Sequence, residues 1–233
     1  MRRALVRRVV SWTPADGALA GAPDARFLPP LVRRRCDDVT RAMLHVANEC
    51  ANAEQLAACA CVFASRYASL SALVELLEAL AAGKPLSPNT FSHSVHNAPA
   101  GVFSVWAKNR NACSSIAAGH ESFACGLLEA FCLLAREPAR DVLLVCGDEY
   151  PLAPLTPHAD ALAPTHALAL LLGTGGEGAP LELVLEQGST AREAGRGPDE
   201  LAFAAWWSKG EPAFTLEHAP RRWILRREER AFP

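Results

Sequence analysis

The sequence predicts an α/β layered fold, in which helices cover a sheet of mostly buried strands. Short apolar runs of strand length recur along the chain, at residues 57–64, 141–146, 167–172 and 181–186. Segments with apolar residues at helical spacing lie between several of these runs. Strands that alternate with helices are typical of a sheet with helices packed on it.

The N-terminal half supplies two strands and two helices. Residues 4–12 are expected to form a strand, and a loop rich in Pro, Gly and Ala follows to residue 30. Residues 31–50 carry apolar side chains at helical spacing and are predicted to form one amphipathic helix. The continuous apolar run 57–64 suits the buried middle of a parallel sheet. A helix over 70–82 should end at Gly83, with Pro85 just beyond.

The C-terminal half continues the alternation. Residues 87–111 are polar, aromatic and irregular in pattern, and a long helix is expected over 114–134. Strands follow at 141–146, 167–172 and 181–186. Residues 151–164 hold four prolines and are predicted to be a loop. The tail from residue 201 holds three of the five tryptophans and is expected to cap the core.

Composition indicates a globular protein without an electrostatic preference for polyanions. Half of the 233 residues are apolar, 21% are charged and the formal net charge is −2. This charge gives no attraction to nucleic acid or to an anionic membrane. Arginines cluster at residues 33–35 and 221–230. These clusters are either solvated faces or docking points for an acidic carrier protein.

The pattern of apolar and cysteine residues predicts a cytoplasmic protein. Arg7 and Arg8 interrupt what would be a signal-peptide core, and no apolar stretch reaches the roughly 18 residues that span a bilayer. Most of the eight cysteines lie in apolar, Ala-rich surroundings. In a reducing compartment such thiols pack as small apolar groups, so no disulfide is expected.

Cys113 is the candidate nucleophile. It lies in the segment Asn-Ala-Cys-Ser-Ser-Ile-Ala-Ala-Gly (residues 111–119), ahead of the predicted helix. A helix N-terminus lowers the pKa of a thiol, and its free N–H groups stabilise an oxyanion on a thioester carbonyl. The alternative is that Cys113 is one more buried cysteine.

Ala112, Cys113, Ser114 and Ser115 resemble the Ala-Cys-Ser-Ser core around the nucleophile of β-ketoacyl synthases. The block 87–98, Ser-Pro-Asn-Thr-Phe-Ser-His-Ser-Val-His-Asn-Ala, is similar to the short stand-alone ketoacyl-synthase N-terminal-like proteins of aryl-polyene and related type II polyketide pathways. Residues 62–66 and 76–88 agree as well. The similarity spans roughly residues 28–172.

The resemblance implies half of a thiolase-like fold: a five-stranded mixed sheet with a buried nucleophile helix and covering helices. Residues 1–233 would form a single ketoacyl-synthase N-terminal-like domain, with a core of about 28–190 and a cap of about 200–233. No histidine stands in the family's C-terminal patterns, so condensation by this chain alone is not expected. The seven histidines are His45, His93, His96, His120, His158, His166 and His218.

The resemblance implies three possible roles. The first is a chain-length-factor-like partner of a complete ketosynthase in fatty acid or aryl-polyene biosynthesis, with an acyl carrier protein as a second partner. The second is an acyl-transferring or priming ketosynthase that uses Cys113. The third is a carrier-protein or lipid-binding module that keeps only the fold. Residues 95–115 would form the subunit interface, and the expected binding or interface residues are His93, His96, Asn97, Ser114 and Ser115.

Other motifs are weaker. His93 and His96, with His120 or Cys113, have zinc-ligand chemistry, but no acidic residue or CxxC pair supports them, and no metal or cofactor is expected. The glycines at 173, 175 and 178 spell a dinucleotide fingerprint but precede a strand, so they predict a turn. Asp148 and Glu149 are either an acid/base pair or a solvated turn. The tryptophans at 206, 207 and 223 either line an acyl pocket or close the core.

Overall fold

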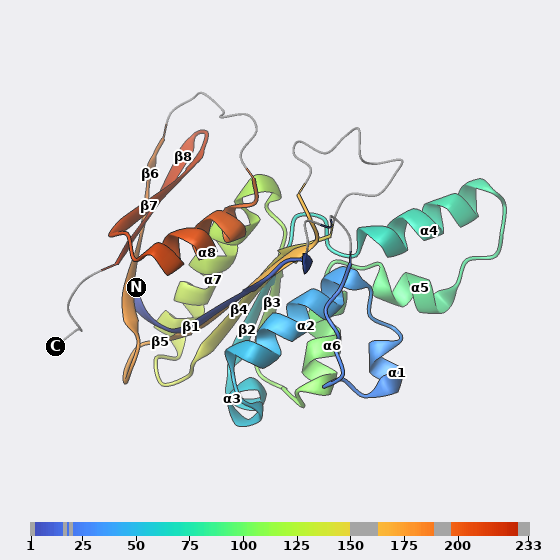
Figure 1. Cartoon of the computed structure of the whole chain (residues 1–233), viewed down its shortest axis with the longest axis horizontal. Helices are drawn as coiled ribbons and strands as arrows, with labels where there is room; N and C mark the ends of the chain where they lie inside the picture. The colour runs from blue at the N-terminus through green and yellow to red at the C-terminus, as the bar shows by residue number, and fades with distance from the viewer. Residues whose placement is uncertain (1–2, 16–17, 19–20, 150–162, 189–196, 228–233) are drawn as a thin grey trace.

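In a computed structural model, the described part of the chain forms one mixed eight-stranded sheet with helices on both faces (Figure 1). The structure describes residues 3–15, 18, 21–149, 163–188 and 197–227. The strands are β1 (Arg3–Trp12), β2 (Ala60–Ala64), β3 (Cys113–Ile116), β4 (Val142–Asp148), β5 (His166–Gly173), β6 (Ala179–Gln187), β7 (Ala213–His218) and β8 (Arg221–Arg227). The helices are α1 (Pro30–Arg33), α2 (Asp38–Cys50), α3 (Ala53–Ala58), α4 (Leu70–Ala81), α5 (Pro88–His93), α6 (Ala98–Trp106), the 3-10 helix η2 (Gly119–Glu121), α7 (Ser122–Arg136) and α8 (Asp199–Lys209).

The strand order is β3-β2-β4-β5-β1-β6-β8-β7, so the expected five-stranded sheet is wrong in its size. β3, β2 and β4 run parallel, and every other pair is antiparallel. The additional strands are β3, which lies where a helix was expected, and β7 and β8 from the tail. In the tail Leu216, Trp223 and Leu225 are buried, and β8 and β7 extend the sheet beyond β6. The parallel position predicted for 57–64 is confirmed for β2.

Two apolar layers sandwich the sheet. β2 divides its side chains between them, because successive residues of a strand point to opposite faces. Val62 and Ala64 join the cluster under α7 and α8, whereas Cys61 and Phe63 join the cluster under α2 and α6. β2 is therefore buried on both faces, as its continuous apolar sequence predicts.

Three predicted elements differ from the structure. The helix expected over 31–50 is two helices, because Asp37 accepts a hydrogen bond from Thr40 N at 2.8 Å and begins α2 anew. Residues 87–111 contain α5 and α6, which begin with Pro88 and Pro99 in their first turns, where proline needs no N–H partner. The helix expected over 114–134 is replaced by β3, η2 and α7, with α7 beginning at Ser122.

Helices α4 and α5 form a hairpin that projects beyond the layered body (Figure 1). We call residues 70–96 the arm.

At the opposite end of the molecule, the first and last strands meet on one carboxylate: Glu182 of β6 lies 3.6 Å from Arg3 and 3.6 Å from Arg226. The predicted turn at 173–178 is present between β5 and β6, whereas most of the loop predicted at 151–164 lies outside the described residues.

No helix in the described part of the chain is both long enough and apolar enough to cross a bilayer.

Candidate functional site

Cys113 begins the edge strand β3 and is exposed. It does not lie at a helix N-terminus, because β3 and η2 separate it from the start of α7 at Ser122. Residues 113–116 instead pair in parallel with β2, so the backbone around the thiol is extended. The physical basis for a helix-activated nucleophile at Cys113 is therefore absent.

A second thiol changes the chemistry of Cys113. Cys61 is its register partner on β2, and the two side chains share a hydrogen bond. Because the Cys61 thiol donates to the Cys113 sulfur, it lowers the pKa of Cys113. The same bond, together with contact to Cys59 and burial, raises the pKa of Cys61. The Cys59 and Cys61 sulfurs are 3.7 Å apart. Cys113 is therefore the thiol of this group that loses its proton most readily.

The two serines of the motif, Ser114 and Ser115, hold β3 against its neighbours in the fold. The hydroxyl of Ser114 donates to Glu129 of α7 at 2.7 Å and so ties the edge strand to the helix. Ser115 pairs in register with Phe63 and is half-buried.

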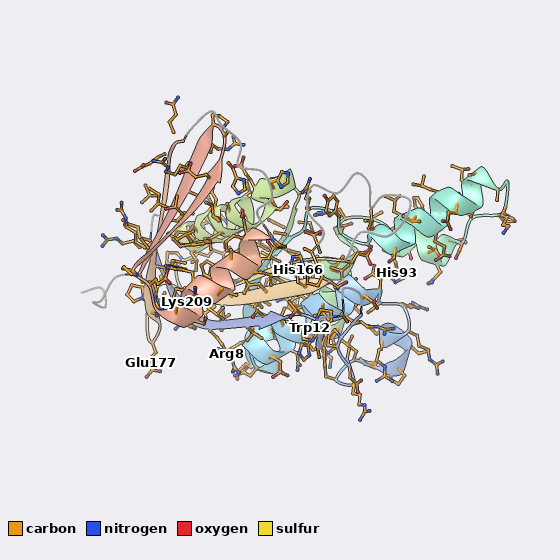
Figure 2. The ribbon with its side chains drawn as sticks, turned by 45° about the horizontal axis from the view of Figure 1, so that its top comes forward. Arg8, Trp12, His93, His166, Glu177 and Lys209 are labelled. Carbon is orange, nitrogen blue, oxygen red and sulfur yellow. The ribbon has the colours of Figure 1, made fainter. Side chains whose placement is uncertain are left out.

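The other predicted site residues do not converge on Cys113. His93 lies on the arm with its Nδ1 2.8 Å from the Asn89 carbonyl oxygen, and Figure 2 shows it well apart from His166. His96 Nε2 lies 3.0 Å from the carbonyl oxygen of Ser65. Asn97 takes the N-cap position of α6 without a side-chain capping bond. His96 orders the turn after β2, and neither histidine contacts the thiol.

The N-terminus of α7 holds a carboxylate. Glu121, at the N-cap position, accepts two hydrogen bonds from Arg221 of β8, at 2.7 and 2.8 Å, and one from Trp223 Nε1 at 3.1 Å. Burial alone would raise the pKa of Glu121, but these bonds and the Arg221 charge hold it below its ordinary value. Glu121 thus places a negative charge at the end of α7, where helix N–H groups favour an anion, although its carboxylate bonds to Arg221 and Trp223 and not to the helix N–H groups.

Asp148, at the end of β4, organises the turn that follows β2. Its carboxylate accepts hydrogen bonds from the Ser65 hydroxyl at 2.6 Å, from Tyr67 N at 2.7 Å and from Arg66 N at 3.0 Å. Glu149 is buried and accepts from Ser71 N. Burial raises the pKa of both carboxyls, that of Glu149 to about 7. The solvated-turn interpretation of these two residues is wrong.

Next to Asp148 lies a buried ion pair. His166 Nε2 is 2.8 Å from Glu200 Oε1, and His166 Nδ1 is 2.7 Å from the carbonyl oxygen of Pro164. Burial alone would lower the pKa of His166, but the bond to Glu200 and the nearby charges raise it to about 9. Figure 2 shows His166 inside the layered body.

Asp148, His166 and Glu200 also form a group whose ligating atoms lie within 4.8 Å of one another, the one such group among the described residues. Both ring nitrogens of a protonated His166 donate hydrogen bonds, so neither has a lone pair for a metal ion. The group is a charge network that joins α8 to the central strands.

Sequence reasoning missed the residues that matter most here: Ser65, Glu121, His166, Glu200 and Arg221. Gly119 was an available signal, because its φ of +59° breaks the helix that the apolar spacing suggested. The partners of Glu121 lie 100 residues away in sequence or further, and no local pattern reveals such pairs.

The fold, with α7 buried against a mixed sheet, defines a thiolase-like α/β protein. The family model described as Beta-ketoacyl synthase, N-terminal domain, matches residues 10–225, so the chain belongs to that family.

Solved structures have the same fold. One is the ketosynthase (ApeO) in complex with its chain length factor (ApeC) from Xenorhabdus doucetiae, with a TM-score of 0.80, 23% identity, and coverage of 97% of this chain and 100% of that chain. The ishigamide ketosynthase/chain length factor gives 0.62 at 15% identity, over 81% of this chain and 68% of that one. A β-ketoacyl synthase from Burkholderia phymatum STM815 gives 0.63 at 10% identity, over 80% and 65%. No curated protein matches in sequence.

Proposed function

We propose that this chain is a chain-length-factor-like partner of a complete ketosynthase, acting in fatty acid or aryl-polyene (type II polyketide) biosynthesis. The observation that carries the proposal is the match to one chain of a ketosynthase and chain length factor complex, which this protein covers over its entire length. Partner subunits of this kind shape the acyl tunnel without running the reaction.

The α7 N-terminus supports a role without condensation. Glu121 occupies the helix end and is held by Arg221 and Trp223. Attack on a thioester carbonyl needs free N–H donors that bind the oxyanion and a nucleophile close to them. The exposed thiol of Cys113 lies on β3 and not at the N-terminus of α7. The arrangement suits a subunit that keeps the fold and contributes surfaces rather than catalytic groups.

Two features suit the docking of the ketosynthase. β3 is one of the two edge strands and presents a row of backbone groups for another strand. The arm lies on the same side of the molecule, joined to β3 through α6 (Figure 1). Exposed apolar side chains gather on the arm, and such patches mark interaction surfaces. They are Leu73, Leu77, Leu80, Leu86, Phe91 and Val95.

The double substitution Leu77→Glu and Phe91→Glu is expected to abolish co-purification with the ketosynthase. Leu77 is 50% exposed and Phe91 is 61% exposed, so the folded monomer tolerates both charges, whereas a buried interface does not. The measurement is pull-down of the ketosynthase from its own gene cluster, co-expressed with this chain. We expect at least a roughly hundredfold loss of affinity, equivalent to about 2.7 kcal/mol.

Leu185→Glu is the matched control. Leu185 is 48% exposed on β6, on the other side of the sheet centre from β3, and its substitution should leave the complex intact. Full binding by the arm variant would show that the arm is not the docking surface. A wild-type chain that never binds a ketosynthase would reject the partner role and favour the lipid-binding or carrier-binding module.

An acyl carrier protein is the second partner of the proposal. In the C-terminal arginine cluster, three of the described arginines are engaged internally: Arg221 pairs with Glu121, Arg222 with Glu217 and Arg226 with Glu182. Arg34 and Arg35 are exposed at the end of α1. They are the better choice for docking an acidic carrier.

The acyl-transfer alternative is favoured by one observation, the lowered pKa of Cys113. If Cys113 accepts an acyl group, incubation with an acyl-carrier thioester should add the acyl mass to its peptide, and Cys113→Ala should lose that mass. We expect no such adduct, because no helix N-terminus lies at the sulfur to bind the oxyanion. Stoichiometric labelling of Cys113 would make the chain an acyltransferase.

A further inference from the structure

The thiol pair formed by Cys113 and Cys61 has the geometry of a peroxide-reactive site. Cys113 is the exposed member and Cys61 is fully buried directly beside it. In-register residues of neighbouring strands point to the same face of a sheet. Adjacent strands lie about 4.8 Å apart, which is inside the range of roughly 4.4–6.8 Å for disulfide-linked Cα atoms. The two sulfurs can therefore be joined with little movement of the backbone.

The two thiols also differ in the way that a peroxide site requires. A site of this type needs an accessible thiolate and a neighbouring resolving thiol. The hydrogen bond from Cys61 lowers the pKa of Cys113 and raises that of Cys61, so the accessible sulfur is the one that loses its proton more readily. Cys59 contacts Cys61 in turn, and the Asn109 amide nitrogen lies 3.7 Å from the Cys61 sulfur.

We propose that Cys113 and Cys61 form an intramolecular disulfide in response to hydrogen peroxide. The Cys113 thiolate attacks one peroxide oxygen and forms an S–O bond while the O–O bond breaks, and hydroxide leaves and takes up a proton as water. The Cys61 sulfur then attacks the Cys113 sulfenic acid, the S–O bond breaks, and a second water carries away the oxygen and the Cys61 proton. Two thiols lose two electrons and two protons, and one peroxide becomes two waters.

The reaction requires only the folded chain, and because the proposed function assigns β3 to ketosynthase docking, it concerns the chain free of that partner. The place of this site on the edge strand gives it a structural consequence, since the disulfide links β3 covalently to β2.

The test uses the full-length wild-type protein and its Cys61→Ser variant, each treated with hydrogen peroxide. The wild type should lose the mass of two hydrogen atoms, with the Cys61 and Cys113 peptides linked. The variant lacks the resolving thiol, so its sulfenic acid should persist at Cys113 and be trapped by dimedone. Dithiothreitol should reverse the wild-type change.

Cys132 provides the internal control. It is exposed on α7 and has no thiol hydrogen bond among the described residues. In the native wild-type protein Cys113 should react with peroxide at least about tenfold faster than Cys132, because the thiolate is the reactive form. Equal rates at the two cysteines, or no linked peptide in the wild type, would overturn the proposal. The wild-type rates decide the outcome even if Cys61→Ser does not fold.

Discussion

Replacing Gly126 with valine is expected to destabilise the protein by about 3 kcal/mol, the upper range for an overpacked core. Gly126 lies on α7 where the helix touches the sheet. A Cβ there would lie 2.8 Å from the Ala64 Cβ and 3.1 Å from a Leu144 methyl carbon. Carbon atoms prefer roughly 3.5–4 Å, so α7 must move away from β2 and β4. Urea denaturation followed by tryptophan fluorescence measures the change.

Gly101→Val is the matched control. Gly101 lies in α6, and a Cβ at that position meets no atom within 4 Å outside its own helix. Valine is a somewhat better helix former than glycine, so the free energy of unfolding should stay within about 0.5 kcal/mol of wild type. Equal stability of the two variants would mean that α7 does not pack closely on the sheet.

The second large expected effect is a decrease in the free energy of unfolding above neutral pH, caused by deprotonation of His166. The folded-state pKa of His166 is about 9, against an ordinary value of 6.5. A raised histidine pKa stabilises the folded state fully below about pH 6.5, and the stabilisation is lost as the pH rises through about 9. Each tenfold gain in proton affinity on folding contributes roughly 1.4 kcal/mol, so the total loss is about 3 kcal/mol. Urea midpoints measured from pH 6 to 10 test it.

Glu200→Gln should flatten this pH dependence, because the hydrogen bond and the charge of Glu200 are what raise the pKa of His166 after burial has lowered it. The variant should also be less stable than wild type at pH 6.5. Glu186→Gln removes a carboxylate from an exposed position of β6 and should leave the curve unchanged. If the Glu200→Gln curve keeps the wild-type slope between pH 7 and 9, His166 is not the titrating group.

The layered α/β architecture could be predicted from the sequence because each buried strand is a short apolar run. β2, β4 and β5 are buried almost throughout, and their sequences are correspondingly apolar. The strands at 213–227 were harder to predict, since their apolar residues are few and pairs of arginines flank the short run 223–225. Leu216, Trp223 and Leu225 nevertheless follow the two-residue period of a strand with one buried face.

The position of the candidate nucleophile could not be predicted from the sequence. Residues 114–134 have apolar spacing compatible with one helix. Residues 113–116 instead form a strand, because they hydrogen-bond to the backbone of β2 at the edge of the sheet. That pairing depends on β2, which lies about 50 residues earlier in the chain. The family resemblance identified the fold correctly, while its four-residue cysteine motif directed attention away from Glu121, which occupies the helix end.

The meeting of Arg3 and Arg226 on Glu182 has a practical consequence for assays. Arg3 begins β1, the first strand of the chain, and Arg226 belongs to β8, the last. The start of β1 and the strand β8 lie at the end of the molecule opposite the arm (Figure 1). A fluorophore attached near either of them is remote from the proposed docking surface. Donor and acceptor dyes on the two subunits can therefore report assembly in real time without obstructing it.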